Sequence, residues 1–185
     1  MAKTTIVNRE QILKGRAFNV EKVHLLMPDG RERAYDLVDH VDAVTILLID
    51  DEGMVYFVRQ YRVGAEKEML ELPAGVMDEG EDPLTTAHRE LQEEIGRDAA
   101  RLERIGGFYM APGYSSEYMH VFFAANLSEH SLEQDEDEFL SLAKVDVREV
   151  FGMIQSGQIE DGKTISTFML AMPLLNDLLI ASNVH

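Results

Sequence analysis

The sequence predicts an α+β domain with α/β/α layers around a mixed sheet, preceded by a small antiparallel β-sheet region over residues 1–40. Two observations support this fold class. Strand-like runs rich in β-branched and aromatic residues alternate with short turns, and three segments repeat apolar residues at helical spacing. Strands, one helix, further strands and two helices follow one another, which is the order typical of a layered domain. Residues 41–185 would form that main domain.

The predicted strands come largely in hairpins. Residues 18–27 and 31–38 flank the turn Pro28-Asp29-Gly30, whose residue types suit a tight reversal. Residues 43–49 and 54–63 flank an acidic turn and form a second hairpin. Further strands are predicted at residues 68–72, 102–110, 118–125 and 139–145.

The first predicted helix covers residues 83–95. Asp82 can cap its first turn, Pro83 suits the first helical position, and Gly96 can end it. Two more helices are predicted at the end of the chain. One runs from the capping residue Asp146 to about residue 155, and the other covers residues 164–180, with a kink or junction at Pro173.

Composition narrows the functional classes. With 17 basic and 34 acidic residues the formal net charge is −17, which excludes non-specific attraction to nucleic acid or to an anionic membrane. The chain has no cysteine, so a metal ion would need oxygen or imidazole ligands. The N-terminus lacks the apolar core of a signal peptide, and no apolar run is long enough for a membrane span, so we expect a cytoplasmic protein.

Three glutamates crowd the end of the first helix. Glu90, Glu93 and Glu94 lie within five residues, where like charges three or four positions apart repel one another. Glu90 and Glu94 flank the apolar stripe of the helix and therefore border a buried surface. Carboxylates gathered beside a low dielectric favour a hard cation such as Mg²⁺ or Mn²⁺. On charge alone, an ordinary solvated helix is the better interpretation.

The spacing of these residues changes that interpretation, because it resembles the signature of the Nudix hydrolases. This family hydrolyses nucleoside diphosphates linked to another moiety. The signature is matched by Gly75, Glu81, Arg89, Glu90, Leu91, Glu93, Glu94 and Gly96. One position departs from it, since Arg97 stands where an aliphatic residue is usual.

The resemblance implies roles for the charged residues. Glu90 and Glu94 would be metal ligands, with the backbone carbonyl of Ala74 as another, and Glu93 would bind the metal or its water. Arg89 would steady Glu93. Two further residues would support the site, namely Gly75 by permitting a tight loop and Glu81 from outside the ligand set.

Other stretches resemble the ADP-ribose pyrophosphatase branch of the family. They are "VRQYR", "LELPAG" and "EQDEDEF", together with Pro112, which lies 16 residues after the signature and resembles the marker of that branch. By position, Arg62 would contact the terminal ribose or the pyrophosphate, and Glu117 would lie near the substrate. Glu71 and Arg33 are further candidates for substrate binding.

The acidic run of residues 135–138, between the strands predicted at residues 118–125 and 139–145, would supply the catalytic base. The resemblance puts Glu138 first, as base or metal ligand, and Glu136 second, and the sequence leaves the choice open. The implied reaction is Mg²⁺-dependent cleavage of ADP-ribose to AMP and ribose 5-phosphate, by a homodimer joined through its N-terminal sheet. Two alternatives stay open: hydrolysis of GDP-mannose or another sugar nucleotide, and a non-catalytic nucleotide-binding module.

Overall fold

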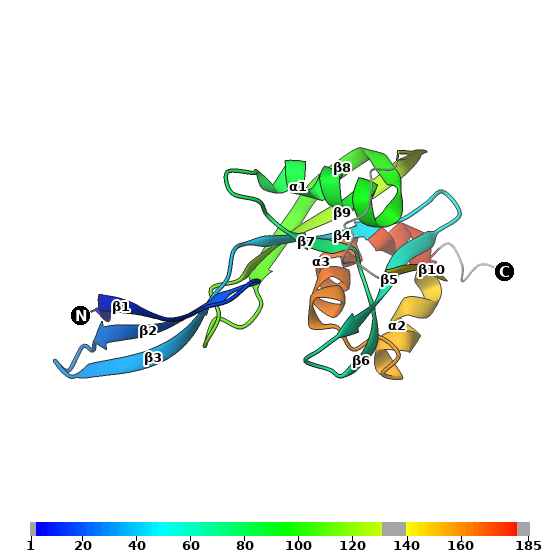
Figure 1. Cartoon of the computed structure of the whole chain (residues 1–185). Coiled ribbons are helices and arrows are strands. Elements are labelled where there is room, and N and C mark those ends of the chain that lie inside the picture. The colour runs from blue at the N-terminus through cyan, green and yellow to red at the C-terminus, as the bar shows by residue number, and fades with distance from the viewer. Residues whose placement is uncertain (1–2, 131–139, 181–185) are drawn as a thin grey trace. The chain divides into compact units, whose positions relative to one another are not determined.

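The computed structural model describes residues 3–130 and 140–180 (Figure 1). The chain forms two compact units, one of residues 1–42 with 108–118 and the other of residues 43–107 with 119–185. Residues 108–118 therefore join the N-terminal unit, although they follow the predicted helix in sequence. The predicted boundary at residue 40 stays a prediction.

The N-terminal unit contains the predicted antiparallel sheet. Its strand order is β1-β2-β3, from β1 (Thr5–Lys14), β2 (Asn19–Leu26) and β3 (Glu32–Asp39). The β2–β3 hairpin turns through Gly30, whose φ of 82° suits glycine. The strand β1 was not predicted, since its apolar residues do not alternate and its pairing with β2 shifts register twice.

The main unit contains two sheets. One has the order β10-β5-β6 and the other the order β7-β4-β9-β8. β4 runs parallel to β9 and antiparallel to β7, which confirms the mixed sheet. Their strands are β4 (Ala43–Leu48), β5 (Met54–Arg62), β6 (Lys67–Glu71), β7 (Ala74–Val76), β8 (Arg97–Tyr109), β9 (Tyr118–Glu129) and β10 (Ser141–Asp146).

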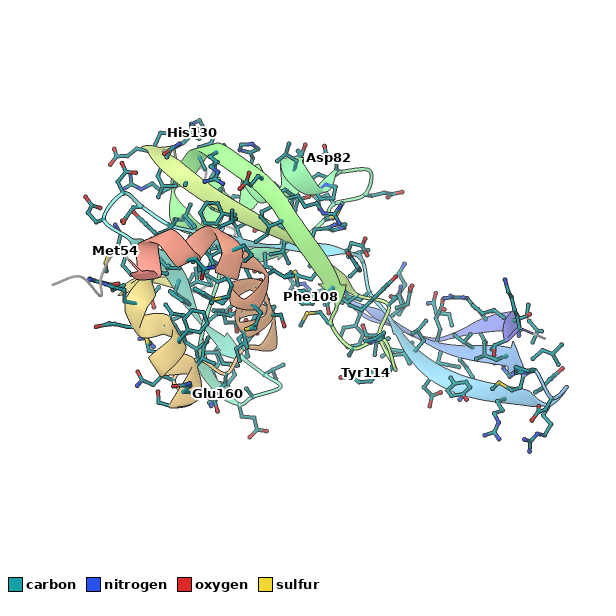
Figure 2. The ribbon with its side chains drawn as sticks, turned by 180° about the vertical axis from the view of Figure 1, so that it is seen from behind. Met54, Asp82, Phe108, Tyr114, His130 and Glu160 are labelled. Atoms are coloured by element: carbon teal, nitrogen blue, oxygen red, sulfur yellow. The ribbon has the colours of Figure 1, made fainter. Side chains whose placement is uncertain are left out.

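The predicted first helix is present but changes type along its length. It consists of α1 (Pro83–Glu90) followed directly by a π-helical turn, η1 (Leu91–Ile95). The side chain of Asp82, labelled in Figure 2, accepts hydrogen bonds from the N–H groups of Leu84 and Thr85 and so caps α1 as predicted. Gly96 ends η1 with a φ of 70°.

The last two helices are α2 (Val147–Gln155) and α3 (Gly162–Ile180). Asp146 caps α2, and Pro173 lies inside α3 without ending it. Among the helices of residues 3–130 and 140–180, none combines the length and the apolar character that crossing a membrane demands.

The side chains of β4 show how the layers form. Ile46 and Leu48 pack with α1 and η1, whereas Leu47, and Ile49 directly after the strand, pack with α2 and α3. Because neighbouring side chains of a strand point to opposite faces, helices cover the sheet layer on both sides (Figure 1). The predicted α/β/α arrangement is therefore confirmed.

The core between β4 and the helices α2 and α3 centres on Phe168 of α3. Its ring stacks on Phe57 with centroids 6.2 Å apart and meets Phe151 edge-on at 6.0 Å. We expect Phe168→Ala to lower the free energy of unfolding by about 3–5 kcal/mol, measured by urea unfolding. Met169→Ala is the matched control, since this side chain is 63% exposed and should change stability by less than about 0.5 kcal/mol. Equal losses in the two variants would contradict this account of the core.

Candidate active site

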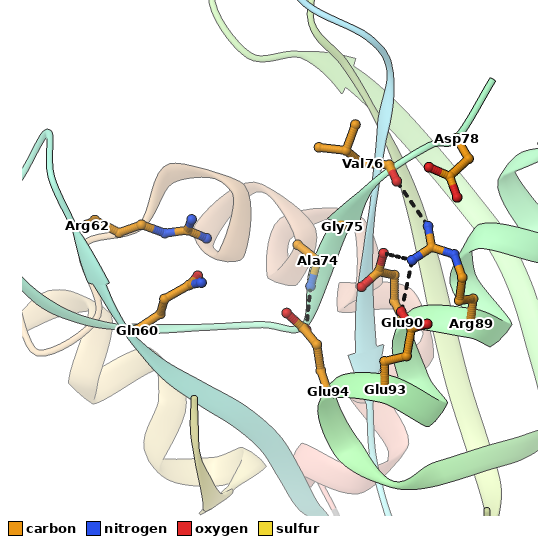
Figure 3. A pocket seen from close by; sticks show the side chains of 10 residues that line it. All are labelled: Gln60, Arg62, Ala74, Gly75, Val76, Asp78, Arg89, Glu90, Glu93 and Glu94. Atoms are coloured by element: carbon orange, nitrogen blue, oxygen red, sulfur yellow. Dashed lines mark hydrogen bonds and ion pairs between the residues drawn. The ribbon is translucent and has the colours of Figure 1, made fainter. Parts of the chain in front are cut away.

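A polar cavity of about 410 Å³ lies between β5, β7 and the α1–η1 segment (Figure 3). Gln60 and Arg62 extend into it from β5, opposite the glutamates of α1 and η1. Its remaining lining comes from β7 and the loop after it. The lining residues are Gln60, Arg62, Ala74, Gly75, Val76, Asp78, Arg89, Glu90, Glu93 and Glu94.

Close contacts between β7 and the helix fix the positions of two carboxylates. The N–H of Ala74 donates a hydrogen bond to Oε2 of Glu94 over 3.1 Å, and Glu94 is only 3% exposed. Gly75 lies against Glu90, since a Cβ on this glycine would come within 1.9 Å of Glu90 Oε1. The sequence Ala74-Gly75 thus allows the backbone to approach both carboxylates.

Arg89 lies at the centre of the acidic cluster. Its Nη1 donates to Oε1 of Glu90 at 2.7 Å and to Oε2 of Glu93 at 2.9 Å, and its Nη2 donates to Oε2 of Glu81 at 3.2 Å and to the carbonyl of Val76 at 3.0 Å. Partial burial works to lower the pKa of Arg89, but the hydrogen bond to Glu81 and the charge of Glu90 outweigh it and raise the pKa. This bonding is consistent with the expected role of Arg89 in steadying Glu93.

The guanidinium of Arg62 is held by the buried carboxylate of Glu71. Its Nε and Nη2 donate to the two oxygens of Glu71 at 2.8 and 2.6 Å, the paired geometry that a guanidinium and a carboxylate favour. Burial works to raise the pKa of Glu71, but Arg62 and Lys163 outweigh it and lower the pKa. Glu71 is 1% exposed, does not line the cavity and bonds Arg62, and its direct contact with a substrate stays a prediction.

The cavity suits a cation in charge and in donor type. Four carboxylates line it against two guanidiniums, and carboxylate oxygens are the ligands that Mg²⁺ and Mn²⁺ prefer. In the described part of the chain, however, no three acidic or histidine side chains converge closely enough to hold a metal ion. Arg89 bonds one oxygen of Glu90 and one of Glu93, so a metal shared by these two carboxylates would compete with its guanidinium.

The remaining predicted site residues belong to other parts of the chain. Pro112, Glu117 and Arg33 belong to the N-terminal unit, where Pro112 and Arg33 are exposed and the N–H of Glu117 donates to Ser115 Oγ. Their contact with substrate stays a prediction. Glu136 and Glu138 lie outside the described residues.

Three lining residues were not predicted, namely Gln60, Val76 and Asp78. Gln60 precedes Arg62 by two positions, and alternate residues of a strand share a face, so Arg62 could have pointed to it. Asp78 follows Gly75 by three residues in an acidic loop, where nothing in the sequence separates it from its solvated neighbours.

The family model of the NUDIX domain matches residues 39–168, which is more than two thirds of the chain. The chain belongs to the Nudix family. It is 37% identical over 160 residues to the ADP-ribose pyrophosphatase of Bacillus subtilis (strain 168), covering 85% of this chain and 86% of that protein. The predicted family and the predicted class of enzyme, a Nudix hydrolase, are confirmed.

A solved Nudix-type structure and a more distant relative complete the comparison. The crystal structure of an ADP compounds hydrolase superposes with a TM-score of 0.84 at 31% identity, covering 95% of this chain and 96% of that one. A GDP-mannose pyrophosphatase of Yersinia enterocolitica serotype O:8 is 27% identical over 177 residues, covering 88% of this chain and 92% of that protein. The structural likeness confirms the predicted fold class over nearly the whole chain.

Proposed function

We propose that this Nudix protein hydrolyses the pyrophosphate bond of a nucleoside diphosphate sugar, cleaving ADP-ribose to AMP and ribose 5-phosphate. One observation carries the proposal: the signature carboxylates and Arg62 face the same cavity from opposite walls (Figure 3). That places an anion-binding group across from a cation-binding cluster, as a pyrophosphate with its counterions requires. The Bacillus relative supports ADP-ribose, and the solved relative supports ADP compounds more broadly.

In this proposal the predicted residues at the cavity have defined roles. Glu90, Glu93, Glu94 and the carbonyl of Ala74 would hold Mg²⁺ or Mn²⁺. Such an ion neutralises charge on the phosphates and lowers the pKa of water. Arg62 binds phosphate oxygens or the neighbouring ribose.

Residues beside the cavity and in the acidic loop complete the proposed mechanism. Arg89 and Glu81 keep the carboxylates oriented by the hydrogen bonds between them. Either Glu138 or Glu136 accepts the proton of the attacking water. Glu117, Pro112 and Arg33 remain proposed substrate contacts.

The proposal also includes a homodimer formed through residues 1–40, in the cytoplasm. Half of the side-chain surface of several apolar residues on β1 is exposed, and such a face is typical of a surface that another chain covers. These residues are Ile6, Val7, Ile12 and Leu13. On β2, Leu25 and Val20 pair with Ile6 and Leu13, so apolar residues continue from the edge strand onto its neighbour.

Two other functions remain as alternatives. The GDP-mannose pyrophosphatase relative favours a guanine sugar nucleotide, which the same carboxylates and Arg62 would accommodate at the pyrophosphate. A non-catalytic nucleotide-binding module is the second alternative. It has little use for a cluster of mutually repelling carboxylates, since these cost stability without a cation.

The test is a hydrolysis panel with identified products. We expect AMP and ribose 5-phosphate from ADP-ribose in the presence of Mg²⁺, no turnover after excess EDTA, and recovery when Mg²⁺ is added back. The comparison substrates are GDP-mannose and ADP-glucose, ranked by kcat/KM. Faster cleavage of GDP-mannose would replace ADP-ribose by the alternative, and no hydrolysis of any member would leave the binding module.

A further inference from the structure

Arg62 is backed by a buried ionic network that reaches from the end of β6 to the start of α3. We propose that Lys163, acting through Glu71, is a positioning residue that holds Arg62 toward the cavity. The proposal rests on the proposed function, in which Arg62 binds the phosphates or ribose of the substrate. Lys163 itself does not line the cavity and is 6% exposed.

Glu71 is shared between the two cations. Arg62 Nη2 and Lys163 Nζ both donate to Oε2 of Glu71, while Arg62 Nε donates to Oε1. Since both carboxylate oxygens are engaged, Glu71 is fixed in one rotamer. The forked geometry then fixes the plane of the Arg62 guanidinium, whose side chain is 43% exposed on the cavity side of the pair.

The position of Lys163 is fixed in turn by the first turn of α3. Its Nζ donates to Oδ2 of Asp161 at 2.9 Å, and the same oxygen accepts from the N–H and hydroxyl of Thr164 at 3.0 and 2.6 Å. The hydroxyl of Thr164 accepts from the N–H of Leu72, next to Glu71, at 2.9 Å. A closed ring of bonds therefore joins Glu71 and Leu72 to the start of α3. Arg62 is bonded to this ring through Glu71 and lines the cavity.

Charge gives Lys163 a second effect on Arg62. A carboxylate paired with a single guanidinium cancels most of the field that this guanidinium presents to an approaching phosphate. Because Lys163 shares Glu71, part of the carboxylate charge is already compensated. Removing the lysine would leave Arg62 both less firmly oriented and more fully neutralised, so substrate binding should weaken while the carboxylate cluster keeps its geometry.

The first experiment measures kcat and KM for ADP-ribose in Lys163→Met. We expect KM to rise roughly 10-fold, in line with couplings inside one hydrogen-bonded network, with kcat per folded molecule within about 2-fold. Lys163→Arg, which keeps the cation, should recover much of the loss. The matched control is Lys67→Met, which removes an exposed lysine that joins β6 to Glu160 without touching Glu71, and it should leave KM unchanged.

A double-mutant cycle separates positioning from a structural role. In an Arg62→Met background, Lys163→Met should have no further effect on KM, because the residue through which it acts is gone. A further KM increase of the same size, or a fall in kcat in proportion to the folded fraction, would overturn the proposal.

A second measurement does not depend on hydrolysis. In ¹H–¹⁵N spectra the Nε–H of Arg62, which donates to Glu71, should exchange slowly with solvent in the wild type and in Lys67→Met, and faster in Lys163→Met. If the substrate panel shows no turnover, the proposed function fails and this signal still tests the network. Unchanged exchange in Lys163→Met would refute the positioning role even in an active enzyme.

Discussion

Glu94→Gln should lower kcat by roughly 10³-fold, equivalent to about 4 kcal/mol of transition-state stabilisation. The amide oxygen can still accept the hydrogen bond from the N–H of Ala74, so the change removes charge and keeps shape. Because Glu94 is almost buried beside other acidic residues, losing its charge also relieves repulsion. The melting temperature should therefore stay level or rise while turnover falls.

The matched control for this variant is Glu79→Gln. Glu79 is exposed in the acidic loop before α1 and does not line the cavity. The chemical change is the same as in Glu94→Gln. Single-turnover kinetics under saturating Mg²⁺ and calorimetry on both variants give the comparison. Undiminished turnover in Glu94→Gln, or equal losses in both variants, would contradict the assigned metal-ligand role.

Gly75→Ala should reduce kcat by about 10- to 100-fold with little loss of stability. The added methyl group would lie 1.9 Å from Oε1 and 2.0 Å from Cδ of Glu90, so the carboxylate must move. Glu90 is 7% exposed and bonded by Arg89, which leaves it few alternative positions. The result should be a displaced ligand in an otherwise intact fold.

Gly152→Ala provides the control for this backbone change. Gly152 lies in α2, and a methyl group there meets nothing within 4 Å, so activity should be unchanged and stability slightly higher. Raising the Mg²⁺ concentration should recover part of the activity of Gly75→Ala, since a displaced ligand weakens binding of the ion. Full activity of Gly75→Ala at low Mg²⁺ would show that the close approach to Glu90 has no functional role.

Local chemistry explains which parts of the fold could be predicted. Asp82 and Gly96 mark the ends of the first helical segment through capping and a left-handed backbone, and both effects depend only on near neighbours. The change from α1 to η1 was not predictable, because residues 91–95 have ordinary helical composition. Met169 is an apolar residue of the last helix but is exposed, since Phe168 and Ala171 define the buried face instead.

The candidate site likewise has a part that the sequence could predict and a part that it could not. Arg89, Glu90, Glu93 and Glu94 lie so close in sequence that their spacing alone brings them together. Lys163 is 92 residues from Glu71, and no periodicity or motif relates them, so only the packing of α3 against β6 brings them into contact. Sequence reasoning consequently named Arg62 and Glu71 as candidates but did not predict the bond of Glu71 to Lys163.

The bonds of Arg89 bear on how a cation would enter this site. Since one guanidinium already bonds Glu90 and Glu93, an incoming ion would compete with an internal cation for these two carboxylates. The free energy of binding the cation is then the difference between the new contacts to the ion and the lost contacts to Arg89. The apparent affinity is therefore weaker than the acidity of the cavity suggests. We therefore expect activity to saturate at a higher free Mg²⁺ concentration than carboxylates without an internal cation would require.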